Sequence, residues 1–254
     1  MRFSLMTYNI LDGAAGREEL VAEVLAACRP DLVLLQEVID PAAAAGWARA
    51  GGYHHVVARS FSKRRIALLS RFPIERASCL HPFPPIRTTI LKATVLLPGG
   101  RRLALFGAHL VPHFAWWFEL WRRWEVAVLL REAARGDNLP AAIAGDFNAI
   151  APGDGIGAET LPANLRRMLR WQGDRIFHLA LGALLRAGWA DCFRTLHPGE
   201  RGWTLPPDRP NARLDYVFAN QALLPALRSC AVVREPAAVL RASDHLPVLA
   251  EFEL

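Results

Sequence analysis

Lysine is nearly absent from this 254-residue chain, in which Lys63 and Lys92 are the only lysines among 30 basic side chains. The formal net charge of +6 therefore comes almost entirely from arginine. Arginine binds phosphate groups through paired hydrogen bonds, so the surplus suits a phosphate-bearing partner. An arginine-biased genome would produce the same composition, and composition alone slightly favours that explanation.

Cysteine is also scarce, and long apolar runs and low-complexity segments are missing. Cys28, Cys79, Cys192 and Cys230 lie far apart with no C-x-x-C pair, which argues against a thiolate metal site and a disulfide framework. The N-terminus, MRFSLMTYNI, lacks the features of a secretory signal, and segments such as Phe177 to Leu185 are too short to span a bilayer. We therefore expect a soluble, globular, cytoplasmic protein.

Short apolar runs of strand character alternate with helical patterns along the chain. Strands outnumber helices, and several follow one another directly, which indicates hairpins together with crossovers. This mixture predicts an α/β (α+β) fold of mixed sheets with helices packed outside, in a single domain over residues 1–254. The predicted strands are 3–8, 32–35, 53–57, 66–69, 90–97, 103–110, 141–144, 214–219 and 248–252, and the predicted helices include 17–28, 114–135 and 161–170.

Polar and charged side chains stand at the ends of several of these apolar runs. Charged groups at the boundary of a buried strand are costly unless they are paired, hydrated or bound to metal. Each one alone has an ordinary explanation, such as a turn cap or a structural histidine. Gathered at one edge of a sheet sandwich, they would form a site. The residues are Asn9, Glu37, His109, Asp146, Asn148, Asp215, Asp244 and His245.

Six short blocks carry these residues: TYNIL, LQEV, GAHL, AGDFNA, RLDYVFA and SDHLPV. In this order they resemble the endonuclease/exonuclease/phosphatase superfamily of metal-dependent phosphoesterases, and the resemblance runs from Thr7 to Val248. G-D-x-N alone is a weak signal, whereas all the blocks in order are a strong one. The resemblance implies a four-layer sandwich of two mixed sheets packed face to face, with helices on both outer sides and the site at one edge.

The resemblance also implies a bound divalent cation, Mg²⁺, for which Mn²⁺ can substitute. Glu37 is by similarity a principal ligand, with Asn9 supporting it and Asp244 contacting the metal cluster or a second metal. Oxygen ligands suit Mg²⁺, which keeps several waters and so needs few protein ligands. Hydrolysis of an anionic phosphodiester requires such a cation because negative charge builds on the phosphoryl and leaving oxygens.

The same resemblance assigns five residues to the reaction. Asp146 aligns and deprotonates the attacking water, and Asn148 donates its amide hydrogens to a phosphoryl oxygen. Because these two lie two residues apart at a strand end, we expect their side chains on the same face. His245 contacts the phosphate and is oriented by Asp215, a pairing that favours the imidazolium. His109 protonates the leaving oxygen or binds phosphate.

Three segments look particular to this chain. The basic run from Lys63 to Arg65 could bind phosphate, but a solvated loop is favoured. The segment HFAWWFELWRRWEVAVLL combines tryptophans with Arg122 and Arg123; it could stack bases, with these arginines on phosphates, or sit at a lipid surface, although its helical spacing favours core. The arginine-rich helix over 161–170 could form a substrate-selecting lid, and an ordinary surface helix is at least as consistent.

The sequence therefore predicts a Mg²⁺- or Mn²⁺-dependent hydrolase of phosphate esters. Its basic charge favours a phosphodiesterase that acts on DNA or RNA, as an endonuclease or an exonuclease. A phospholipid or small-molecule phosphoesterase, similar to sphingomyelinases or inositol phosphatases, is the alternative that the tryptophans favour. A non-catalytic phosphate-binding module is disfavoured because no metal or water-handling residue has been lost. Nothing in the sequence indicates an obligate protein partner.

Overall fold

Two six-stranded mixed sheets face each other in the computed structural model, which describes residues 1–81, 89–135 and 139–254. The first sheet contains, in spatial order, β11 (Leu227–Val232), β12 (Val248–Glu253), β1 (Arg2–Asn9), β2 (Leu32–Val38), β4 (Arg65–Ser70) and β3 (His54–Val57). The second contains β5 (Ile74–Leu80), β6 (Ile90–Leu97), β7 (Arg101–His109), β8 (Ala141–Asp146), β10 (Asp215–Ala219) and β9 (Ala190–Asp191). The pairs β1–β2 and β7–β8 are parallel and the other pairs are antiparallel.

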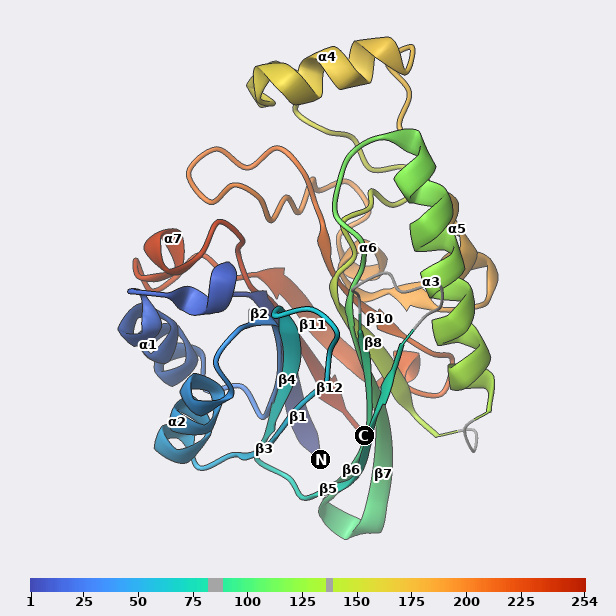
Figure 1. Ribbon diagram of the computed structural model, residues 1–254. Coiled ribbons are helices and arrows are strands. Elements are labelled where there is room, and N and C mark those ends of the chain that lie inside the picture. The colour runs from blue at the N-terminus through green and yellow to red at the C-terminus, as the bar shows by residue number, and fades with distance from the viewer. Residues whose placement is uncertain (82–88, 136–138) are drawn as a thin grey trace.

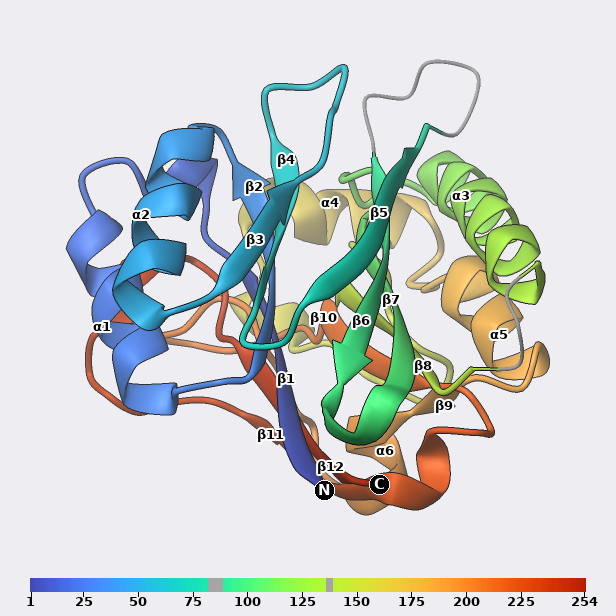
Figure 2. The same ribbon diagram turned by 90° about the horizontal axis from the view of Figure 1, so that it is seen from below.

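Helices cover the outer face of each sheet, which confirms the predicted four-layer sandwich (Figures 1 and 2). The first sheet is covered by α1 (Glu18–Cys28), α2 (Pro41–Gly51) and the short α7 (Val239–Ala242). The second is covered by α3 (Trp116–Ala134) and α5 (Leu179–Arg186). The helix α4 (Ala163–Trp171) stands clear of both sheets in Figure 1, and α6 (Cys192–Leu196) packs near β10 and β11. The 3₁₀ turns are Asp12–Ala14, Pro98–Gly100, Ala158–Thr160 and Leu224–Ala226.

The apolar runs of the sequence follow from the fact that both faces of the central strands are covered. In β1, Phe3 and Leu5 pack into the core between the sheets, whereas Met6 and Tyr8 pack against the helices. Successive side chains of a strand point to opposite faces, so a strand buried on both sides reads as one continuous apolar run. Within the described ranges, no helix is long and apolar enough to cross a membrane.

Several elements lack the apolar pattern on which the strand and helix predictions rest. The strand β5 lies at a sheet edge and is largely exposed, and β11 is the opposite sheet's edge strand, so neither alternates strongly. The helix α2 is signalled instead by its start, where the Asp40 side chain accepts the N–H of Ala42 and Pro41 occupies the first turn.

The topology brings the polar strand ends to one edge of the sandwich. The parallel strands β1, β2, β7 and β8 all finish there, and the antiparallel strands β10 and β12 begin there. A hydrogen bond of 2.9 Å from Asn9 Nδ2 to Asp146 Oδ2 joins the ends of β1 and β8 across the two sheets. The polar residues of six strands thus meet at one place.

Candidate active site

Three neighbouring strands of the second sheet place three site residues side by side. His109 pairs with Asp146 in the register of β7 with β8, and Asp146 pairs with Asp215 in the register of β8 with β10. Asp146 and Asp215 are buried, and the His109 side chain is slightly exposed. These three residues therefore form a row at the edge of the second sheet, and the two carboxylates in it are buried.

Gly145 is required by the close approach of β7 and β8 beside this row. Its φ is 155°, and a Cβ at this position would lie 1.8 Å from the carbonyl oxygen of Ala108. A side chain therefore cannot be accommodated without moving the backbone of β7. The glycine in the AGDFNA block thus allows His109 and Asp146 to end in adjacent positions.

Glu37 reaches the site through an irregularity in β2. The pairing of β2 with β4 shifts register between Leu35 and Val38, and Glu37 has a φ of 64°. A bulge of this kind re-aims a side chain, and a left-handed non-glycine residue at such a place is typical of functional sites. The Glu37 carboxylate accepts the N–H of Asp12 at 2.8 Å and lies 3.8 Å from Nε2 of His109.

Asp146 is the centre of the polar contacts. Its Oδ2 accepts Nδ2 of Asn9 at 2.9 Å and lies 3.7 Å from His109 Nε2 and 3.8 Å from His245 Nε2. Its Oδ1 accepts the backbone N–H of Asn148 at 2.9 Å. The carboxylate is therefore oriented by hydrogen bonds from Asn9 and Asn148 and faced by two imidazoles, which is suitable for handling a proton.

Asn148 meets Asp146 through a turn and not through strand alternation. The strand β8 ends at Asp146, and Asn148 has a φ of 48°. The side-chain Nδ2 of Asn148 donates to the carbonyl of Leu110 at 3.0 Å and to Asp146 Oδ2 at 3.3 Å. The side chains are adjacent as the sequence predicted, but Asn148 lies in a bent segment beyond the end of β8 and not on the strand itself.

His245 and Asp215 form a buried pair. The distance from His245 Nδ1 to Asp215 Oδ2 is 2.8 Å, and the same oxygen accepts the Thr204 hydroxyl at 2.7 Å. Burial by itself lowers the pKa of His245, but the carboxylates of Asp215 and Asp146 outweigh it and raise the pKa to about 10. These carboxylates therefore favour the imidazolium at neutral pH, and its Nε2 lies 3.8 Å from Asp146 Oδ2.

Two further residues support this pair, and motif spacing alone did not identify their roles. Ser243 donates its hydroxyl to the carbonyl of Asn9 at 2.6 Å and accepts the N–H of His245 at 3.2 Å, linking β1 to the SDHLPV block. Thr204 lies in a loop without any recognised motif. Asp244, next to Ser243, has a half-exposed side chain whose Oδ1 lies 4.0 Å from His245 Nε2.

Oxygen donors and unbalanced negative charge make this site suitable for a hard divalent cation. Glu37, Asp146 and Asp215 are all buried, and Asp215 Oδ1 is buried with no hydrogen-bond partner among the described residues. Asp146, Asp215 and His245 each offer one ligand atom within 4.8 Å of the others. Asp146 and Asp215, to which the resemblance gives roles in the reaction, are therefore also possible oxygen ligands for a cation. His245 is not one while it is an imidazolium.

The basic run from Lys63 to Arg65 is partly the solvated loop that was favoured, since Lys63 and Arg64 are exposed and precede β4, but its two arginines also make contacts near the site. Arg64 pairs with Asp12 at 2.6 Å, and its Nε lies 3.1 Å from Glu37 Oε2. Arg65 donates to the carbonyl of Ile39 at 2.6 Å. A guanidinium is thus part of the site's edge.

A sequence profile of the endonuclease/exonuclease/phosphatase family matches residues 6–245. The chain belongs to this family. Its members hydrolyse phosphate esters. No curated protein is similar enough in sequence to match the chain.

Solved structures repeat the fold of this family member over its whole length. An AP endonuclease from Archaeoglobus fulgidus aligns with a TM-score of 0.75 at 21% identity, covering 99% of this chain and 100% of that chain. The 3′ phosphatase NExo from Neisseria, bound to a product DNA hairpin, aligns at 0.74 and 24% identity, covering 99% and 100%. An endonuclease/exonuclease/phosphatase from Beutenbergia cavernae aligns at 0.75 and 22%, covering 100% and 72%. At these identities the likeness establishes the fold.

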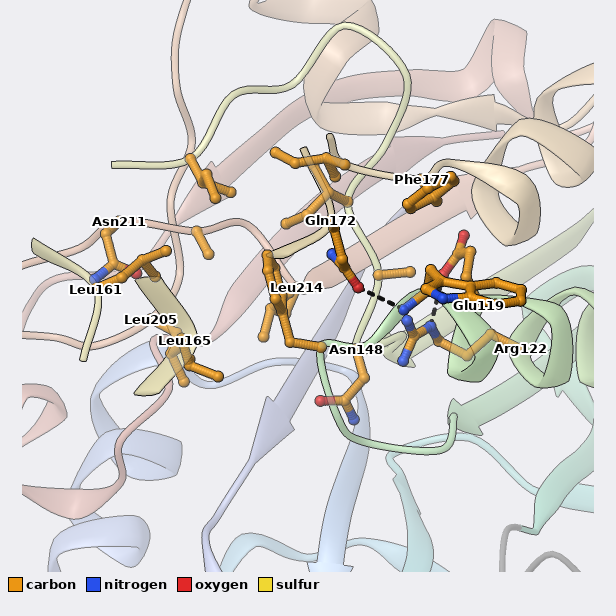
Figure 3. Close-up of a pocket in the computed structure, with 17 residues that line it drawn as sticks. Glu119, Arg122, Asn148, Leu161, Leu165, Gln172, Phe177, Leu205, Asn211 and Leu214 are labelled. Atoms are coloured by element: carbon orange, nitrogen blue, oxygen red, sulfur yellow. Dashed lines mark hydrogen bonds and ion pairs between the residues drawn. The ribbon is translucent and has the colours of Figure 1, made fainter. Parts of the chain in front are cut away.

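A mostly apolar cavity of about 100 Å³ lies beside Asn148 of the candidate site (Figure 3). Asn148 lies at one end of it, and Leu214, Leu165 and Phe177 contribute apolar walls. Gln172, just after α4, accepts the N–H of Trp116 at 2.6 Å and so fastens α4 to the start of α3. The cavity can take an apolar or aromatic group attached to a phosphate held near Asn148.

The helix α3 turns tryptophans outward, contrary to the core placement that their spacing favoured. Trp116, Trp117 and Trp121 are 43%, 38% and 46% exposed. The buried face carries charge instead, with Arg122 Nε donating to Glu119 at 2.7 Å. The prediction of a helix was right, and the prediction of which face is buried was wrong.

Arg122 is buried, which agrees with the core placement that was favoured for this segment and not with the alternative in which it contacts nucleic-acid phosphates. Its guanidinium donates to the carbonyls of Val111 and His113 at 3.0 and 2.8 Å. Glu119 accepts the N–H of Ala180 at the start of α5 at 2.9 Å. The charged pair therefore satisfies backbone groups of two neighbouring segments, which explains its burial.

Proposed function

We propose that this chain is a divalent-metal-dependent phosphodiesterase that acts on nucleic acid. The observation that carries the proposal is the arrangement around Asp146: a buried carboxylate oriented by Asn9 and Asn148 and faced by His109 and by the imidazolium of His245. Such a set can move one proton and hold one anion at the same place. Membership of the family supports the same reaction class.

Glu37, Asn9 and Asp244 would hold the cation, which we propose is Mg²⁺, with Mn²⁺ able to substitute. Their oxygens are hard donors, and Glu37 is buried and aimed by its bulge. When bound, the cation would supply charge neutralisation for the phosphoryl oxygens. Arg64 would compete with the cation for Glu37, since the Nε of Arg64 lies 3.1 Å from Oε2 of Glu37.

Each residue of the set then has one task. Asp146 accepts the proton of the attacking water, because its Oδ2 is oriented by Asn9 and lies within 4 Å of both site imidazoles. His245 donates Nε2–H to a phosphoryl oxygen, and Asp215 keeps the ring charged and oriented. Asn148 supplies amide N–H groups to the same phosphate in exchange for its present contacts. His109 protonates the leaving oxygen.

Nucleic acid is the substrate class with the broadest support. The chain has a net charge of +6, and the structures named above include a DNA-bound 3′ phosphatase and an AP endonuclease. The apolar cavity beside Asn148 suits a nucleobase or sugar next to the scissile phosphate. We also propose that residues 1–254 act as a single domain and that the location is cytoplasmic, which the four unpaired cysteines support.

A phospholipid phosphoesterase is the second candidate. The exposed tryptophans of α3 favour it, because they border the same cavity and suit the boundary between water and lipid.

A substrate panel tests the proposal. The purified chain is incubated with single- and double-stranded DNA, RNA, sphingomyelin, inositol phosphates and cyclic dinucleotides, with Mg²⁺, with Mn²⁺ or with chelator. We expect cation-dependent cleavage of nucleic acid, and a loss of about 10²- to 10⁴-fold in turnover for Asp146→Asn with the fold intact. Cleavage that continues in excess chelator, or cleavage of lipid alone, would contradict the proposal.

A further inference from the structure

In the described part of the chain, the exposed large hydrophobic side chains are concentrated on and near the helices α3 and α4. Of the twelve large hydrophobic residues that are exposed within the described ranges, seven lie on α3, on α4 or between α4 and the start of α5. Soluble proteins tolerate scattered exposed apolar residues, but a contiguous group marks an interaction surface. The seven are Trp116, Trp117, Leu120, Trp121, Trp171, Phe177 and Leu179.

On the first turns of α3, the aromatic side chains face solvent and the charged side chain is buried. Trp116, Trp117, Leu120 and Trp121 recur at helical spacing on one side, and Leu120 is 49% exposed. The acidic side chain in this half of the helix, Glu119, is buried on the other side. The face toward solvent is therefore uncharged and apolar over its first turns, which is the opposite of an ordinary surface helix.

The helix α4 extends this face and adds positive charge. The rings of Trp117 and Trp171 are 6.1 Å apart at 80°, so the two helices form one continuous surface. Arg167 and Arg170 are exposed on α4, which contains no acidic residue. The nearest exposed acid in the sequence after α4 is Asp174, and Arg175 follows it directly.

We propose that this Trp–Arg face, formed by Trp116, Trp117, Leu120, Trp121, Arg167, Arg170 and Trp171, binds the surface of an anionic lipid bilayer. Tryptophan is favoured at the boundary between water and lipid, and arginine beside it binds acidic headgroups. Figure 1 shows α4 projecting beyond the two sheets, beside the end of α3 at which Trp116 lies.

A single-stranded nucleic acid fits this face less well. Base stacking needs open ring faces, but Trp116 and Trp117 pack edge to face at 82°, as do Trp117 and Trp171 at 80°. An exposed leucine between the tryptophans offers nothing to a base, whereas it enters an acyl layer readily. The charge of Arg167 and Arg170 is compatible with a bilayer and with nucleic acid. The arrangement of the aromatic rings is what favours the bilayer.

Docking would turn the active-site edge toward the bilayer. Trp116 of the face and Asn148 of the site both line the same cavity. Gln172, which Figure 3 shows in this cavity, accepts the N–H of Trp116 and so connects α4 to α3. A phosphodiester lying on or near a membrane would therefore be met by the open side of the site. This consequence depends on the location of the substrate and not on its identity.

Vesicle binding tests the surface without relying on catalysis. The full chain, in chelator so that no turnover occurs, is sedimented with vesicles of phosphatidylcholine alone or mixed with phosphatidylglycerol, and tryptophan fluorescence is recorded. We expect binding to the anionic vesicles with a blue shift. Leu120→Ser/Trp121→Ser should weaken binding on the order of tenfold. Arg167→Gln/Arg170→Gln should weaken it roughly 10- to 30-fold, on anionic vesicles only.

Two control variants remove an exposed leucine or a pair of exposed arginines elsewhere. Leu240→Ser removes an equally exposed leucine on α7, and Arg2→Gln/Arg101→Gln neutralises two exposed arginines at the opposite end of the sandwich. Both controls should bind as the unaltered chain does. Absence of vesicle binding, or equal losses in the controls, overturns the proposal. Binding of an oligothymidylate that is lost in the α3 and α4 variants, without vesicle binding, overturns it in favour of nucleic acid. None of these outcomes depends on whether the chain hydrolyses phosphodiesters.

Discussion

Replacement of Gly145 by alanine tests whether the spacing of β7 and β8 creates the catalytic row. The added Cβ would lie 1.8 Å from the carbonyl oxygen of Ala108, and the φ of 155° is unfavourable for any other residue. The neighbouring register pair is His109 with Asp146. The substitution therefore strains the backbone one residue away from two proposed catalytic groups.

The cost has two parts. A non-glycine residue in such a backbone region costs about 1–3 kcal/mol, and forcing atoms into a packed interior costs about 1–3 kcal/mol more. The total of about 2–6 kcal/mol is a large share of the roughly 5–15 kcal/mol that stabilises a domain. For a chain of this size we expect the melting temperature to fall by roughly 5 to 20 °C.

Urea unfolding and calorimetry measure the loss, and Gly46→Ala is the matched control. Gly46 lies inside α2, and an added Cβ there would meet no atom within 4 Å, so alanine should stabilise the helix by about 0.5–1 kcal/mol. Hydrolysis by folded Gly145→Ala protein at low temperature should fall by roughly 100-fold, because small displacements of catalytic groups are costly. A Gly145→Ala variant as stable and active as the unaltered chain would refute this account of the strand spacing.

Three further substitutions probe the site and its support. Arg213→Leu should lower stability by about 3–5 kcal/mol, because it leaves buried Asp191 without the guanidinium that lies 2.6 Å away; an unchanged urea midpoint would contradict this. Asn148→Asp should lower turnover by about 10²- to 10³-fold while circular dichroism stays unchanged, because a carboxylate cannot donate to a phosphate; a near-normal rate would remove the amide from the mechanism. Arg64→Gln should lower the Mg²⁺ concentration for half-maximal activity by roughly three- to tenfold, because a competing charge leaves Glu37; an increase would show that the arginine instead holds Glu37 in place.

Local patterns in the sequence were enough to predict most of the fold and most of the residues of the candidate site. Continuous apolar runs identify strands covered on both faces, and the polar residues that end them identify the edge at which they meet. Asn9 and Asp146 are 137 residues apart in sequence yet 2.9 Å apart in space, and the ordered motif blocks were sufficient to associate them. The sequence patterns did not predict exposed edge strands such as β5, because an exposed strand has no buried face and therefore no apolar pattern.

The sequence by itself determined that α3 is a helix, that Glu37 ends an apolar strand and that Arg64 lies in a basic run. Only the tertiary structure decided that α3 buries Glu119 with Arg122 and exposes its tryptophans, that a bulge aims Glu37, and that Arg64 reaches it. The physical reason is that periodicity depends on neighbours within one element, whereas burial of a charged pair depends on partners from elsewhere. Arg122 can be buried because the carbonyls of Val111 and His113 accept its hydrogens, and Glu119 because the N–H of Ala180 meets it.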